Sequence, residues 1–284
     1  MNFEKLIPAV EALGINLYRM AFWQDGRIQD HCFQPVSNCS NSYSVAKLFC
    51  VTAVGMLQDD GLLDVKKPLK DYMGDLIPGD ADPKWQYATV ENALMHRLGF
   101  GEGLLDIDVD DASQYPTRDY LDMVFHHPLA YEPGEKYQYT DAAFYLVSRL
   151  VSCVTGEKLD EFLNRRLFRP LKFREVAWSR CPMDYPMGAT GLYIGAHDAV
   201  KLAAVYLEGG KWQDRQIVSE NWVKAVLENK YELYPKSPAG WVGKGGMYGQ
   251  MVMLNPEKKC AIAWHAHCSN EDAQRLISCI DEHL

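Results

Sequence analysis

The chain has 284 residues, 48% hydrophobic and 24% charged, which is the composition of an ordinary globular protein large enough for a sizeable core. Its net charge of −9 at pH 7 argues against nucleic acid or an anionic membrane as a partner, because both attract basic faces. No apolar run approaches membrane-spanning length, and the first residues lack the pattern of a signal peptide. We therefore expect a cytoplasmic protein.

The N-terminal segment is predicted to form a helix and two strands. Residues 3–13 place apolar side chains at helical spacing. Residues 15–23 alternate like a strand, a turn follows at 24–27, and residues 28–33 are predicted to return as a second strand.

The next stretch, residues 45–57, is almost wholly apolar or small and carries one charge, Lys47. It has no polar stripe, so we predict a helix buried on all sides. A lone buried ammonium is costly, and Ser44 precedes it by three residues, on the same helical face. A hydroxyl beside a desolvated amine is a nucleophile beside a base. Alternatively, Lys47 extends its ammonium to the surface from a core helix, and this segment alone leaves both interpretations open.

The remaining chain is mainly helical up to about residue 207, with a further helix at 219–229 and a final one at 270–280. Between these last two helices, residues 247–254 and 260–267 are strand-like. We predict an α/β (α+β) fold in which N- and C-terminal strands build one antiparallel sheet, flanked by helices, with a mainly helical lobe inserted. The expected organisation is one domain over residues 1–284. Its sheet lobe comprises about 1–43 plus 215–284, and its helical lobe about 44–214.

Two further segments contain candidate functional residues. Tyr139 follows a Pro-Gly turn and stands at a loop-to-helix junction, where side chains can reach into a cleft. Residues 243–250 are rich in glycine and are predicted to open a strand, so that the backbone can approach a ligand and an N–H can serve as an oxyanion donor. Taken alone, the first is a structural tyrosine and the second a glycine-rich turn.

Together, Ser44-x-x-Lys47, Tyr139-x-Asp141 and Lys244-Gly245-Gly246 resemble the motifs of the penicillin-recognising serine hydrolases. The tyrosine that opens the middle motif makes the chain similar to the class C β-lactamase group. That group also contains D-alanyl-D-alanine peptidases, D-aminopeptidases, family VIII-type esterases and aminohexanoate-dimer hydrolases. The resemblance extends from about residue 14 to 267 and includes a loop beginning at His96 and the helix after Ser44.

The resemblance implies a β-lactamase-like fold and a set of roles. Ser44 would be the acylated nucleophile, Lys47 the amine that activates it, and Tyr139 the partner acid and base. The oxyanion hole would be formed by the backbone N–H groups of Ser44 and Met247. Substrate binding would involve Asp141, Lys244, Gly245 and Gly246. Which of Lys47 and Tyr139 takes the serine proton stays open, since coupled groups can share a proton.

Three positions depart from the family pattern. Asp141 stands where the family has Asn, and its carboxylate cannot donate a hydrogen bond and would favour a protonated Lys47. Gly245 replaces a hydroxyl residue that helps to hold a substrate carboxylate, which counts against efficient β-lactam hydrolysis. Arg97 and Leu98 replace Thr-Ser in the His96 loop.

No metal or cofactor is expected. His265 and His267 have no third ligand nearby in sequence, and Asp106, Asp108, Asp110 and Asp111 lack the glycine of a calcium loop, so we predict an acidic, solvated loop. The eight cysteines form no C-x-x-C pair.

We therefore expect a serine hydrolase that forms an acyl-enzyme with a small ester, amide or D-amino-acid peptide. A β-lactamase or a D-Ala-D-Ala carboxypeptidase proper is the first alternative. A catalytically weak binding or sensor module on the same scaffold is the second, and Asp141 makes it plausible. The sequence sets neither the natural substrate nor the oligomeric state.

Overall fold

The computed structural model describes residues 3–284, and their chain divides into two compact units. The sheet unit comprises the residues up to Val45, then 168–177 and 192–284. The helical unit comprises 46–167 and 178–191. The expectation that both form one catalytic domain stays a prediction.

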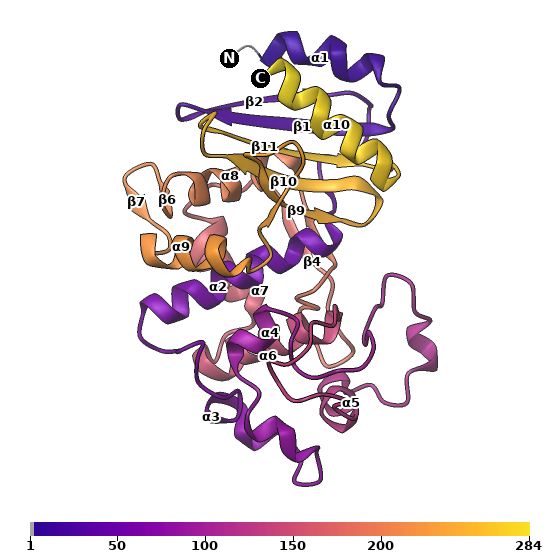
Figure 1. Ribbon diagram of the computed structural model, residues 1–284, viewed down its shortest axis with the longest axis vertical. Helices are drawn as coiled ribbons and strands as arrows, with labels where there is room; N and C mark the ends of the chain where they lie inside the picture. Colours follow the sequence, from indigo (N-terminus) through magenta and orange to yellow (C-terminus); the bar gives the residue numbers. More distant parts are fainter. Residues whose placement is uncertain (1–2) are drawn as a thin grey trace. The chain divides into compact units, whose positions relative to one another are not determined.

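The sheet unit is built on six antiparallel strands in the order β2-β1-β11-β10-β9-β8 (Figure 1). The strands are β1 (Leu17–Gln24), β2 (Arg27–Cys32), β8 (Tyr234–Pro235), β9 (Val242–Gly246), β10 (Gln250–Asn255) and β11 (Cys260–Ala266). N-terminal β1 pairs with C-terminal β11, for example Met20 opposite Trp264. The predicted sheet from both ends of the chain is therefore confirmed.

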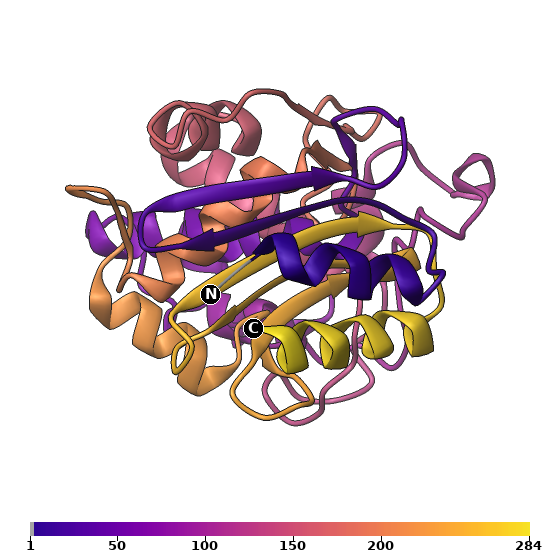
Figure 2. The same ribbon diagram turned by 90° about the horizontal axis from the view of Figure 1, so that it is seen from above.

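Helices cover both faces of this sheet. Helices α1 (Phe3–Ala12) and α10 (Asn270–His283) pack side by side on one face, as Figure 2 shows from above. Helix α8 (Ala196–Leu207) packs on the other face, against β1, β10 and β11. The α1 and α10 face forms a continuous apolar core with strand residues such as Phe22 and Ile262, because alternate strand side chains point to the same side.

Shorter elements complete the sheet unit. The small strands are β3 (Ser40–Asn41), β4 (Val176–Trp178), β5 (Leu192–Ile194), β6 (Lys211–Trp212) and β7 (Arg215–Gln216), and the remaining helix is α9 (Glu220–Asn229). Strand β3 pairs with β5, which fixes the backbone just before the candidate nucleophile.

The helical unit is organised around α2 (Ala46–Asp59), whose residues 46–57 are all buried, as predicted from the missing polar stripe. Its other α-helices are α3 (Lys70–Met73), α4 (Val90–Leu94), α5 (Tyr120–His126), α6 (Asp141–Thr155) and α7 (Leu159–Leu163). The short 3₁₀ or π turns of this unit are η2 (Gly74–Leu76), η3 (Pro83–Gln86), η4 (Ala112–Gln114) and η5 (Asn164–Phe168), the last of which ends in the sheet unit. The sheet unit contains two more, η1 (Tyr43–Val45) and η6 (Met247–Gly249). The predicted helical region thus contains long loops as well as helices.

Two boundary predictions were wrong at the candidate site. Val45, predicted to be the first residue of the buried helix, belongs with Ser44 to the turn η1 that precedes the helix. The strand predicted over 247–254 begins at Gln250, because Tyr248 adopts a left-handed backbone (φ 59°) that interrupts extended structure.

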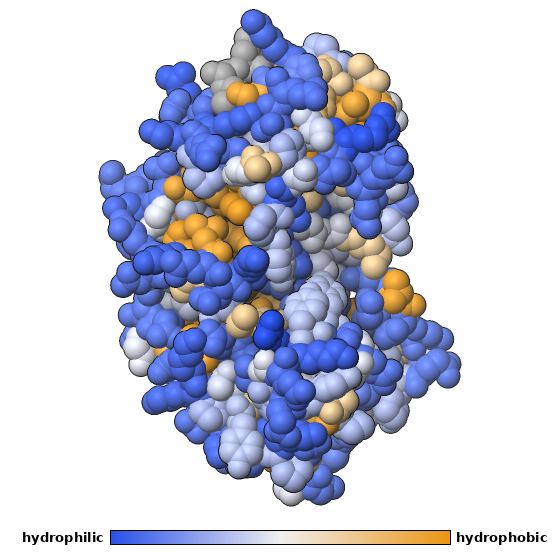
Figure 3. Space-filling model, viewed as in Figure 1, coloured by the Kyte–Doolittle hydropathy of each residue, from blue (hydrophilic) through white to orange (hydrophobic). Residues whose placement is uncertain are grey.

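The molecular face in Figure 3 is largely hydrophilic, with smaller hydrophobic areas. None of the helices within residues 3–284 combines the length and apolar character needed to cross a membrane.

Candidate active site

Lys47 is completely buried, so the interpretation in which its ammonium reaches the surface was wrong. Its Nζ lies 2.8 Å from Oδ1 of Asp141 and donates to the carbonyl oxygen of Ala189 at 3.0 Å. The same Nζ lies 4.8 Å from the ring centroid of Tyr139. A buried ammonium is tolerated only when paired and hydrogen-bonded, and these contacts supply both conditions.

Asp141 is the first residue of α6, and only 5% of its side chain is exposed. A carboxylate is favourable at a helix N-terminus, where the backbone N–H groups lack acceptors. The departure from the family's Asn therefore has a structural consequence. A neutral amide could not compensate the charge of Lys47, whereas the carboxylate stabilises the ammonium form.

Tyr139 is held by the loop that contains His96. The two rings stack with centroids 4.5 Å apart, and the Thr140 N–H donates to Nδ1 of His96 at 3.3 Å. Oγ1 of Thr140 in turn donates to the carbonyl oxygen of Leu104 at 3.0 Å. His96 is buried and has a left-handed backbone (φ 53°), a strained conformation that surrounding contacts must maintain. His96 thus positions the tyrosine segment.

Three carboxylates lie together in the helical unit. Oxygen atoms of Asp106, Asp108 and Asp141 are all within 4.8 Å of one another, which could hold a cation. Burial raises the pKa of Asp106 and that of Asp108, and the charge of Asp141 raises both further. Asp106 is exposed and Asp108 is half-buried, as expected of an acidic, solvated loop, but the sequence did not predict that both lie close to Asp141. Lys47 already supplies one positive charge to the group.

In the sheet unit, Ser44 is partly exposed and lies in η1. Gly246, the last residue of β9, allows a close approach to this turn. A Cβ at Gly246 would lie 2.4 Å from the carbonyl oxygen of Ser42, which no real side chain permits. Met247 follows at the start of η6, rather than at the start of a strand as predicted. Its N–H as an oxyanion donor stays a prediction.

Lys244 has a buried partner that the sequence analysis missed. Its ammonium forms an ion pair with Glu232, which is fully buried and accepts a hydrogen bond from the Tyr234 hydroxyl at 3.3 Å. Glu232 has a left-handed backbone (φ 62°) just beyond the end of α9. Lys244 therefore does not present an uncompensated positive charge.

No sequence signal identified Glu232, because its position depends on a turn conformation. The position of Asp106 and Asp108 in an acidic loop before the middle motif was visible in the sequence, but their proximity to Asp141 was not.

His265 and His267 lie in different surroundings. The first is buried and contacts Oε1 of Gln250 through Nδ1 at 2.8 Å, and the second stacks on Tyr248.

Comparisons with known proteins bear on this arrangement. The family model described as Beta-lactamase matches residues 39–278. The chain is 27% identical over 140 residues to N-acetylmuramyl-L-alanine amidase of Bacillus subtilis (45% of this chain, 30% of the relative). It is 25% identical over 193 residues to 6-aminohexanoate-dimer hydrolase of Paenarthrobacter ureafaciens (65% and 49%). It therefore spans less than half the length of these curated relatives.

The fold has solved counterparts. A penicillin-binding protein homologue from Caulobacter crescentus superposes with a TM-score of 0.77 at 16% identity, covering 98% of each chain. The predicted fold class and the predicted family resemblance are confirmed.

Proposed function

Because the chain belongs to the Beta-lactamase family, we propose that it is a serine hydrolase working through a covalent acyl-enzyme on a small ester, amide or D-amino-acid peptide. The observation that carries this proposal is Lys47. A fully buried lysine three residues after a serine, with a carboxylate and a tyrosine ring around its ammonium, has a clear use as part of a proton-transfer system.

In the proposed reaction, Oγ of Ser44 attacks the substrate carbonyl carbon while its proton passes to the coupled pair of Lys47 and Tyr139. The tetrahedral oxyanion would be stabilised by the N–H groups of Ser44 and Met247. Collapse of the intermediate breaks the bond to the leaving group, which takes the proton from the pair. Water then attacks the acyl carbon and gives a proton to the same pair; the bond between Oγ of Ser44 and the acyl carbon breaks, Oγ takes the proton back from the pair, and the acid product leaves.

Charge around the proposed machinery favours a particular kind of substrate. Asp106, Asp108 and Asp141 place carboxylates beside Lys47, so a substrate with an N–H donor or a cationic amine is favoured near them. Glu232 compensates Lys244, and Gly245 offers no hydroxyl. Both features argue against recognition of a β-lactam or peptide carboxylate, so the β-lactamase or carboxypeptidase alternative has less support. One relative is itself named as an amidase.

The test is covalent labelling with a fluorophosphonate, followed by peptide mass spectrometry. We expect one adduct, on Ser44, that is lost in Ser44→Ala and kept in the control variant Ser40→Ala, which removes a hydroxyl from β3. Labelling at another residue would overturn the assignment.

A substrate panel then separates the subclasses. We expect turnover of p-nitrophenyl acetate and of D-alanine p-nitroanilide, which carries a free amine, to exceed turnover of nitrocefin. The rival hypothesis of a binding or sensor module predicts ligand affinity with neither a label on Ser44 nor any product burst.

A further inference from the structure

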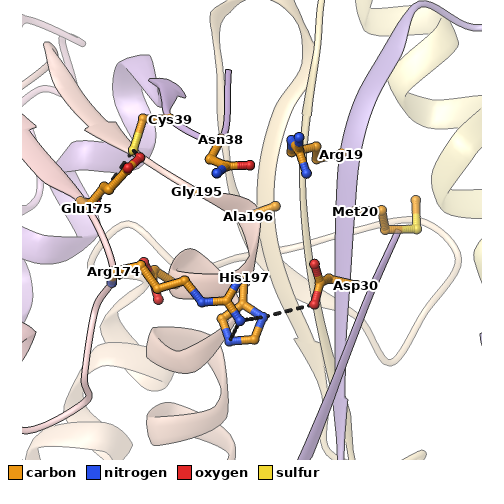
Figure 4. A pocket seen from close by; sticks show the side chains of 11 residues that line it. Arg19, Met20, Asp30, Asn38, Cys39, Arg174, Glu175, Gly195, Ala196 and His197 are labelled. Carbon is orange, nitrogen blue, oxygen red and sulfur yellow. Dashed lines mark hydrogen bonds and ion pairs between the residues drawn. The ribbon is translucent and has the colours of Figure 1, made fainter. Parts of the chain in front are cut away.

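A pocket of about 210 Å³ lies within the sheet unit, away from the residues assigned above. It is bounded by β1, β2, the loop before β3, the segment before β4 and the start of α8 (Figure 4). At about 30 Å³ per water molecule, it has room for about seven waters, which is enough space for a free amino acid.

Two arginines line this pocket without a carboxylate partner among residues 3–284. Met20 belongs to the core on the α1 and α10 face, so Arg19 points to the opposite face, toward the pocket and α8. One guanidinium nitrogen of Arg19 donates to the carbonyl oxygen of Val36 at 3.2 Å. Its Nε, however, is buried and has no hydrogen-bond partner in the described part of the chain. A buried N–H of a cation without an acceptor is costly, and an anionic ligand would satisfy it.

The second arginine, Arg174, lies in the segment before β4 and is held by contacts with the first turn of α8. Its backbone N–H donates to Oδ2 of Asp198 at 2.7 Å, and its guanidinium lies 3.0 Å from Nε2 of His197. Oδ1 of Asp198 is paired with Lys201 at 2.6 Å. The charge of Asp198 is therefore compensated inside the fold, and it does not neutralise the arginines.

Helix α8 adds backbone donors to the same wall. Its N-cap is Gly195, which has no side chain to accept the first N–H groups of the helix. The residues that follow, Ala196 and His197, also line the pocket. First-turn N–H groups and the helix dipole both favour a negative group at this position.

The pocket also contains carboxylates, which argues against a highly charged anion. Glu175 accepts from the Cys39 thiol at 3.3 Å and has no cationic partner among the described residues. Asp30 lies 3.1 Å from Nδ1 of His197 (Figure 4). Burial lowers the pKa of His197, so this contact is a hydrogen bond from a neutral ring rather than an ion pair. Both carboxylates are left to attract a cation.

From this arrangement we propose that the pocket binds a free α-amino acid as a zwitterion, a ligand independent of the proposed hydrolase reaction. The carboxylate would bind to Arg19 and to the N-terminus of α8, assisted by Arg174. The ammonium group would face Glu175 and Asp30. Because the loop that contains Cys39 leads through β3 to Ser44, occupancy of the pocket would also order the segment before the candidate nucleophile.

The test uses the full chain carrying Ser44→Ala, so that turnover cannot contribute. L-Alanine and D-alanine are titrated by calorimetry, and backbone amide shifts are followed by NMR. We expect saturable one-to-one binding of at least one enantiomer, with the largest shifts at Ala196 and His197. Arg19→Gln should weaken binding about ten-fold or more, as for loss of a charge-assisted hydrogen bond. Arg215→Gln, an exposed arginine on β7, should leave it unchanged.

Ligand analogues test each half of the zwitterion. Alaninamide lacks the carboxylate and N-acetylalanine lacks the ammonium group, so both should bind more weakly than alanine. Glu175→Gln should reduce the preference for alanine over N-acetylalanine, and it tests the proposal even if Arg19→Gln does not fold. The proposal is overturned if neither enantiomer shifts Ala196 or His197, if Arg19→Gln binds as wild type does, or if inorganic phosphate displaces alanine at equal concentration.

Discussion

Two buried lysines, one in each unit, have carboxylate partners but different surroundings. Lys47 pairs with Asp141 and lies near two more carboxylates and the ring of Tyr139, and it follows the candidate nucleophile by three residues in sequence. Lys244 pairs with Glu232, which also accepts a hydrogen bond from the Tyr234 hydroxyl. The first pair thus lies in a region of surplus negative charge, whereas the second pair, which has the further cation Lys236 nearby, does not.

This difference in surroundings distinguishes a pair expected to act in catalysis from a pair expected to act only in stability. A buried ion pair contributes little net stability, yet removing one partner is strongly destabilising because a buried charge is left alone. Loss of one partner should therefore lower the stability of the folded protein in both pairs. Only the pair that contains Lys47 should also set the protonation of a catalytic group. Changing one partner at a time distinguishes these roles.

The largest effect is expected for Lys47→Met. Loss of the amine removes a general base or its essential partner, which is worth about 10²–10⁴-fold, so we expect esterase activity to fall by about 1,000-fold. Initial rates with p-nitrophenyl acetate provide the measurement. The double variant Lys47→Met/Asp141→Asn should recover stability, since no charge is left unpaired, without recovering activity. Recovery of activity in the double variant would contradict a catalytic role for Lys47.

For the second pair, Glu232→Gln should lower the free energy of unfolding by about 3 kcal/mol, because the buried ammonium of Lys244 loses its partner. Urea unfolding followed by circular dichroism measures this change. The matched control is Glu228→Gln. That glutamate lies 3.8 Å from Lys224, with 63% and 72% of their side chains exposed, and its loss should change stability by less than about 0.5 kcal/mol. Equal effects of both variants would remove the distinction between buried and surface pairs.

These two predictions differ in how far the sequence alone could support them. The buried helix, the terminal strands and the candidate role of Lys47 were predictable, because hydrophobic patterning and a single charge within an apolar run are visible in the local sequence. That the residue at position 141 faces Lys47 was implied by the family resemblance. Glu232 was not predictable, since its burial depends on a left-handed turn after α9 and on tertiary packing against β9. The proximity of Asp106 and Asp108 to Asp141 likewise depends on how a long loop folds back.

Next in size is the effect of Asp141→Asn on the pH–rate profile. Without the carboxylate, the ammonium form of Lys47 loses stabilisation, and the amine deprotonates more readily. The acidic limb of kcat/KM should therefore move to lower pH by about one unit, equivalent to about 1.4 kcal/mol, and activity at neutral pH should rise. Asp75→Asn, an exposed residue of η2, is the control. An unchanged acidic limb would indicate that protonation of Lys47 does not limit the reaction.

The smallest effect concerns the surplus charge that distinguishes the two regions. Burial and Asp141 raise the pKa of Asp106 above its ordinary value of 3.8, so its ionised form is less favourable in the folded than in the unfolded chain. At neutral pH this lowers stability, and the penalty disappears as the pH falls through the folded-state pKa. Asp106→Asn should therefore stabilise the protein at pH 7 by less than about 1 kcal/mol, because the residue is exposed enough for solvent to screen its charge.

That gain should vanish below about pH 3, where the carboxyl is protonated in both states. Thermal melts of wild type and Asp106→Asn between pH 3 and pH 7 provide the comparison, on the scale set by ordinary carboxyl pKa values of about 4. Glu228→Gln serves again as the control, since its carboxylate lies beside a lysine rather than beside other carboxylates. A loss of stability at pH 7 in Asp106→Asn would mean that this carboxylate stabilises the ammonium of Lys47 more than it is repelled by Asp141. In that case, the first pair would have no surplus of negative charge, and the contrast with the region of Lys244 and Glu232 would fail.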